Sequence, residues 1–73
     1  MKLSSGILNV WFEDRDFGFI HMEKDDVIIS HFLHRANIKS GTPKTGASVL
    51  FRAVSTRKGY IAVDAQFLDG GTK

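Results

Sequence analysis

The sequence contains no cysteine, a single proline and no long apolar run. Without cysteine the chain can form neither a disulfide nor a thiolate metal site, so its fold must depend on packing alone. No apolar stretch approaches the roughly 18 residues that a membrane-spanning helix needs. The first five residues are too few and too polar for a signal peptide. We therefore expect a cytoplasmic domain that does not itself insert into a membrane.

Acidic residues are missing from the middle of the chain. Residues 27–63 hold six basic side chains and no acid, whereas residues 1–26 hold three basic and six acidic ones. The net charge of all 73 residues is only +2, so the distribution is more informative than the total. A long stretch without carboxylates is typical of a surface that faces a polyanion. The alternative is that these basic side chains are spread over several solvated faces.

Five short apolar segments are separated by polar or glycine-containing breaks. A chain of 73 residues forms one small domain. The segments cover residues 7–12, 17–22, 27–32, 48–54 and 60–68. Within residues 48–54, Val49 and Phe51 alternate onto one face, and the irregular residues 33–47 leave room for one helical turn at most. This pattern predicts an all-β fold, a five-stranded antiparallel Greek-key barrel of the oligonucleotide-binding (OB) type. We assign residues 1–68 to this domain and residues 69–73 to a flexible tail or the start of a linker.

The segment Arg15-Asp16-Phe17-Gly18-Phe19-Ile20 is the most informative part of the chain. On a strand, Phe17 and Phe19 point to the same face, and Gly18 leaves the opposite face bare. Two interpretations follow from this spacing. The rings either fill the inside of the barrel or form an outward platform on which nucleic-acid bases stack.

The chain resembles the cold-shock domain family, small five-stranded OB barrels that bind single-stranded RNA and DNA. Residues 15–20 look like the first ribonucleoprotein motif of that family, normally Lys-Gly-Phe-Gly-Phe-Ile, and residues 26–32 are similar to its second motif. The landmarks that keep the family spacing from Phe17 without a gap are Phe19, His31, Phe32, Gly46, Val49, Phe51, Gly59 and Ala62. The resemblance therefore extends over most of the chain.

The resemblance implies a binding site for single strands on the second and third strands. Bases would stack on the aromatic rings, and basic side chains at the edges would contact phosphates. The predicted nucleic-acid-binding residues are Trp11, Arg15, Phe17, Phe19, His31, Phe32 and Lys58. We expect a monomer that binds single-stranded RNA or DNA in the manner of an RNA chaperone, with no cofactor and no small-molecule substrate.

Four departures from the family pattern predict weaker binding. Asp16 replaces a glycine and puts a negative charge beside the platform, while Asn9 replaces a lysine. Ile29 stands at the position of an exposed phenylalanine, and Ser40 stands near that of a loop aromatic. The expected platform is accordingly smaller than in the fuller pattern.

The first strand allows two registers. Strict alternation buries Leu8, Val10 and Phe12 and turns Trp11 outward to stack with bases. Gapless alignment with the family instead places Trp11 at a buried aromatic position and Val10 at the stacking position. That register leaves Phe12 near the rim and requires a bulge in the strand. We favour the second, in which Trp11 packs at the edge of the barrel.

The third strand is also open to two registers. The first keeps His31 and Phe32 at the His-Phe position of the family, with Ile29 exposed. The second aligns the preceding Asp-Val pair directly and leaves Ser30 and His31 in those two places. We favour the first because it preserves both rings and the overall length.

Metal binding and catalysis are not expected. His31 and His34 have an H-x-x-H spacing, but no third ligand is suitably spaced for zinc. Ser30 and His31 are neighbours on a strand and point apart, so they cannot form a nucleophile–base pair.

The alternative to a nucleic-acid-binding function is that of an N-terminal interaction or regulatory module of a larger, possibly membrane-bound, protein with weak affinity for nucleic acid.

Overall fold

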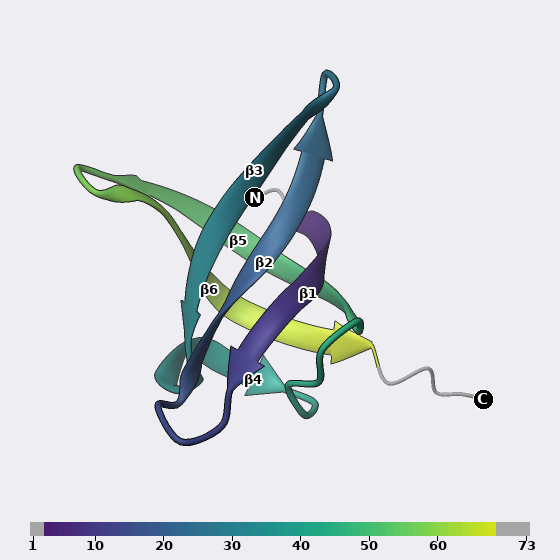
Figure 1. The fold of residues 1–73 in the computed structure, drawn as a ribbon, viewed down its shortest axis with the longest axis vertical. Coiled ribbons are helices and arrows are strands. Elements are labelled where there is room, and N and C mark those ends of the chain that lie inside the picture. The colour runs from purple at the N-terminus through teal and green to yellow at the C-terminus, as the bar shows by residue number, and fades with distance from the viewer. Residues whose placement is uncertain (1–2, 69–73) are drawn as a thin grey trace.

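The computed structural model describes residues 3–68, which form an all-β domain (Figure 1). The strands are β1 (Ser4–Phe12), β2 (Phe17–Lys24), β3 (Val27–His34), β4 (Ile38–Ser40), β5 (Ser48–Thr56) and β6 (Gly59–Leu68). One 3₁₀ turn, Arg35–Asn37, precedes β4. All five predicted segments are strands, and the sixth strand, β4, was not predicted. The tail predicted for residues 69–73 lies outside the described residues.

Five of the strands close into a barrel. Their order is β3-β2-β1-β5-β6, and β6 returns to pair with β3, while β4 adds to the sheet beside β6. The pairs β1–β2, β2–β3, β1–β5 and β5–β6 are antiparallel, whereas β3–β6 and β4–β6 are parallel. The predicted five-stranded barrel is therefore confirmed, but its purely antiparallel arrangement is wrong. Strand directions cannot alternate around a closed ring with an odd number of strands, so one neighbouring pair must be parallel.

Apolar side chains from the inner faces of the strands fill the barrel. The buried core consists of Leu8, Ile20, Leu33, Val49, Phe51, Ala62, Ala65 and Phe67. Val49 and Phe51 occupy the face predicted for them from the alternation in β5. Burial of this apolar surface stabilises the fold, since the chain has no disulfide. Within residues 3–68, no helix has the length and apolar character needed to cross a membrane.

A bulge in β1 sets the position of Trp11. Leu8 pairs with Ile20 and Val10 pairs with Phe19, so Asn9 has no partner in β2. This irregularity turns Trp11 toward the core, against which its ring packs. Trp11 pairs across the strands with Gly18, where an added Cβ would collide with the Val10 carbonyl oxygen and lie 2.8 Å from the indole ring. The gapless register predicted for the first strand is therefore confirmed.

A two-residue turn fixes β3 against β2. Lys24 pairs with Val27, and the intervening Asp25 and Asp26 have φ angles of 53° and 66°. Positive φ at both central positions is typical of a type I′ hairpin turn, whose twist matches that of the strands. The resulting register brings Phe19 directly opposite Phe32.

Candidate nucleic-acid interface

Four phenylalanine rings gather on the outer side of the barrel, on β1, β2 and β3. The ring centroids of Phe12 and Phe17 are 5.3 Å apart, and those of Phe17 and Phe32 are 5.4 Å apart. Phe19 lies 6.0 Å from Phe17 and 5.8 Å from Phe32. The three rings of β2 and β3 are half-buried, and Phe12 is 39% exposed. We call these four residues the phenylalanine cluster. The interpretation that Phe17 and Phe19 fill the barrel is not supported, because neither belongs to the buried core.

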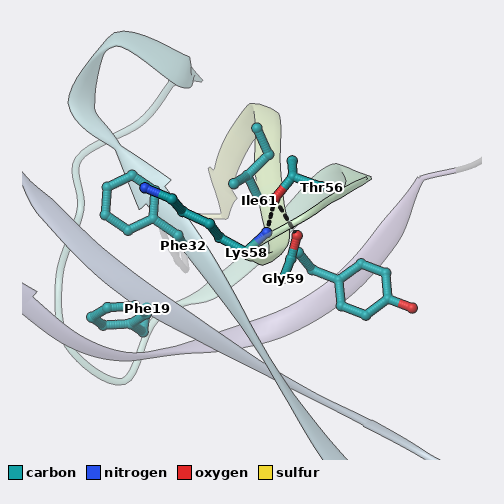
Figure 2. A pocket seen from close by; sticks show the side chains of 7 residues that line it. Phe19, Phe32, Thr56, Lys58, Gly59 and Ile61 are labelled. Atoms are coloured by element: carbon teal, nitrogen blue, oxygen red, sulfur yellow. Dashed lines mark hydrogen bonds between the residues drawn. The ribbon is translucent and has the colours of Figure 1, made fainter.

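A hollow of about 450 Å³ borders the cluster on the side of the β5–β6 turn (Figure 2). It is lined by Phe19, Phe32, Thr56, Lys58, Tyr60 and Ile61, together with the backbone of Gly59. The Thr56 hydroxyl donates to the Gly59 carbonyl at 2.6 Å and accepts from the Lys58 amide at 3.2 Å. These bonds fix the turn from which Lys58 extends toward Phe32 (Figure 2). Lys58 thus stands beside the open face, as the sequence predicts.

A second hollow, of about 430 Å³, borders the cluster on the side of the β1–β2 turn. Phe12, Asp14, Arg15 and Phe17 line it. Arg15 therefore lies at the edge of the ring platform, where the sequence analysis placed it. The cluster has a basic side chain in the hollow at each of these two sides, Arg15 at one and Lys58 at the other.

The β1–β2 turn carries an ion-pair network centred on Arg35. Its Nε donates to Asp16 Oδ1 at 2.8 Å, and its Nη2 lies 3.5 Å from Glu13 Oε2. Its guanidinium carbon lies 5.5 Å from the ring centroid of Trp11, whose Nε1 donates to the other oxygen of Glu13 at 3.1 Å. The hydrogen bond that Arg35 donates to Asp16 raises the pKa of Arg35. The charge of Asp16 is therefore paired with Arg35, which weakens its repulsion of phosphates.

His31 is not on the outer face, and its predicted placement there is wrong. Its side chain is 1% exposed and packs between Phe51 and Tyr60, with ring centroids 5.0 Å and 5.3 Å away. Successive side chains of a strand point to opposite faces, so His31 turns inward when Phe32 turns outward. Burial lowers the pKa of His31.

Ile29 was predicted to be exposed, and this is also wrong. It lies two residues before His31 and therefore shares the inner face of β3. Its partner across the strands is Met22, which packs against the core. The outward positions of β3 before Phe32 are Ser30 and Ile28, both exposed. The outward position of Ser30 agrees with the second register described for this strand in the sequence analysis. The outward position of Phe32 agrees with the first register, which we favoured.

Trp11 and three other residues complete the picture of the interface. Trp11 is half-buried at the edge of the barrel, on the opposite side of β2 from the cluster. Three residues that join the cluster or line its hollows were not predicted as site residues: Phe12, Tyr60 and Ile61. Phe12 could have been predicted from the sequence, because the gapless register of the first strand placed it near the rim. No local pattern marks Tyr60 or Ile61, which reach the site only because β6 pairs with β3.

The described residues contain no group of three or more His, Cys, Asp or Glu side chains able to hold a metal ion. The Nδ1 atom of His34 accepts a hydrogen bond from the Ala36 amide at 3.0 Å and caps the 3₁₀ turn.

No protein-family model matches the chain, and a search of curated proteins finds no match either.

Proposed function

We propose that this domain binds single-stranded RNA or DNA, without catalysis, by stacking bases on the phenylalanine cluster. The observation that carries the proposal is the cluster itself, four rings on an outer face that each contact at least one other ring, with a basic side chain in the hollow at each of two sides. Large aromatic rings gain more free energy inside a core than at a surface. Four of them gathered outside the core are better suited to contact a partner than to stabilise the fold.

The chemistry of the two hollows fits an unpaired strand. Every base has a π-face, so rings in a row bind successive bases with little dependence on sequence, each stacked base contributing about 1–3 kcal/mol. The backbone of the strand would then pass the guanidinium of Arg15 at one hollow and the ammonium of Lys58 at the other. Charge-assisted contacts with phosphate oxygens suit both groups. A duplex keeps its bases stacked inside and would not offer them to the cluster.

The proposal includes a cold-shock-like OB barrel of Greek-key topology that acts as a monomer in the cytoplasm. The closed barrel, the register that pairs Phe19 with Phe32 and the bulge in β1 support it. A natural role for such a domain is to keep RNA single-stranded. The alternative, an interaction module of a larger protein, would gain if no single strand binds.

Fluorescence anisotropy of short labelled oligothymidylates and oligoadenylates tests the proposal. We prefer a label on the oligonucleotide to Trp11 fluorescence, because Trp11 lies across β2 from the rings. Saturable binding of single strands, with a matching duplex bound more weakly, is the expected result. Equal binding of the duplex and the single strand would show that charge alone, rather than stacking, produces the affinity.

A further inference from the structure

We infer that the hollow beside Phe12 and Phe17 selects guanine through the carboxylate of Asp14. The inference rests on the proposed binding of single strands and adds a base preference at one side of the site. Two aromatic rings, one carboxylate and one guanidinium line this hollow. The rings offer a stacking surface, Asp14 offers two acceptor oxygens beside it, and Arg15 offers a cation to the phosphate.

Asp14 differs from the two other acids of the turn because its side chain makes no hydrogen bond or ion pair within residues 3–68. Glu13 accepts from Trp11 and lies beside Arg35, and Asp16 accepts from Arg35. Among residues 3–68, neither Asp14 nor Arg15 makes a side-chain hydrogen bond or an ion pair. Both side chains are exposed and border the same hollow, so both remain available to a ligand.

The turn that carries Asp14 is held on two sides. The amides of Arg15 and Asp16 donate to the Phe12 carbonyl at 3.0 Å and 2.9 Å. The Asp16 carbonyl in turn accepts from the Arg35 amide at 2.9 Å, which ties the turn to the residue after β3. A turn that is ordered before binding loses less conformational entropy when the ligand arrives. Asp14 is therefore positioned beside the rings in advance.

A carboxylate distinguishes guanine from the other bases at the Watson–Crick edge. Guanine presents N1–H and an N2 amino hydrogen side by side, and the two can donate to both carboxylate oxygens. Adenine and cytosine each present one amino donor beside a ring nitrogen acceptor. Thymine and uracil present one N3–H between two carbonyl oxygens. Only guanine meets the carboxylate without placing an acceptor against it.

The test compares oligonucleotides that differ in one base. Anisotropy titrations use a short oligothymidylate and versions with one guanine placed at each position in turn. We expect guanine at one position to tighten binding about fivefold, near the lower end for a bidentate contact with a base. Inosine at that position lacks the N2 amino group and should lose most of the gain.

Substitution of Asp14 tests whether its carboxylate causes the preference for guanine. Asp14→Asn should abolish the gain from guanine while leaving the affinity for oligothymidylate unchanged or higher, because it removes one negative charge. The control is Asp26→Asn in the β2–β3 turn, at the opposite end of the β1–β2–β3 meander (Figure 1). It makes the same chemical change, and asparagine tolerates the positive φ of 66° at that position. This variant should keep the full preference.

The outcomes separate this inference from the proposed function. If the wild type binds strands but shows no guanine preference, or if Asp14→Asn keeps it, the inference is overturned and single-strand binding stands. If the wild type binds no oligonucleotide at all, the proposed function fails and the inference fails with it.

Discussion

Arg35 and Asp16, which are 19 positions apart in the chain, are joined by a hydrogen bond of 2.8 Å from Nε to Oδ1. Asp16 stands where the family that the chain resembles has glycine, beside the first ring of the phenylalanine cluster. The sequence alone suggests that its carboxylate repels phosphates. Its pairing with Arg35 reduces that repulsion without removing it, since both side chains remain about half exposed.

We predict that Asp16→Gly raises the affinity for single strands about twofold at low salt, where one exposed charge is least screened. Glycine suits the φ angle of 58° at this position, so the fold should be retained. Anisotropy titrations at about 50 mM and 200 mM salt measure the effect. The matched control is Asp26→Gly, which removes the same charge at a remote position that also has a positive φ. Equal gains in both variants would show a general effect of net charge instead of a local one.

A second prediction concerns the exposed rings. Phe19→Ala should weaken single-strand binding by about 1–3 kcal/mol and leave cooperative unfolding intact. Phe17→Ala and Phe32→Ala should behave in the same way. The matched control, Phe51→Ala, removes a ring from the core and should lower the free energy of unfolding by about 3–5 kcal/mol. A loss of stability in Phe19→Ala as large as that in Phe51→Ala, measured by denaturant titration, would show that Phe19 belongs to the core.

A third prediction uses the face assignment of β3. Ser30 points outward two residues before Phe32, so Ser30→Phe should extend the phenylalanine cluster and strengthen binding by up to about 1 kcal/mol. Ile29→Phe adds the same ring on the inner face. It should leave affinity unchanged and destabilise the barrel by about 1–3 kcal/mol through overpacking. Stronger binding by Ile29→Phe would show that the face assignment is wrong.

The buried His31 predicts a loss of stability in mild acid. Burial lowers its pKa in the folded state, so above about pH 6.5 the ring is neutral in both states and the full stability is present. Below that pH the unfolded chain binds a proton that the folded chain does not. The free energy of unfolding then falls by up to about 1.4 kcal/mol per pH unit until the folded-state pKa is reached.

Denaturant unfolding of the wild type and of His31→Gln at several pH values measures this contribution. The variant lacks the titrating ring but keeps His21 and His34, so their effects cancel in the comparison. The stability difference between the two proteins should change as the pH falls through about 6.5. Parallel pH dependences would mean that His31 does not titrate differently in the two states.

The sequence predicted the structure best where a feature is set by a pattern within one strand or by the register of one strand. The spacing of Phe17 and Phe19 around Gly18 predicted rings on one face, and the gapless register predicted the bulge that turns Trp11 inward. The first depends on neighbouring residues alone, and the second depends on the resemblance to the cold-shock domain family. Gly18 illustrates the limit of such an argument: its role in the structure is to admit the backbone and ring of Trp11 on the inner side.

Features made by residues distant in sequence were mostly missed. His31 pairs with Ile20 in β2 and packs against Phe51 and Tyr60, and no local pattern marks these contacts. The pair of Arg35 with Asp16 and the short strand β4 have no local signal. The parallel closure of the barrel is different, since five strands in a ring require it and the predicted number already implied it.

The salt dependence of single-strand affinity tests the central claim most directly. If Arg15 and Lys58 contact phosphates, binding releases counterions, and each contact contributes about −0.7 to the slope of log affinity against log salt. The wild type should show a total slope of about −1.5 to −3. The double variant Arg15→Gln/Lys58→Gln should lower its magnitude by about 1.4. Lys44→Gln, a change at a lysine that lines neither hollow, should leave it unchanged. The absence of binding to any single strand at about 50 mM salt, in the wild type and in Asp16→Gly alike, would contradict the account.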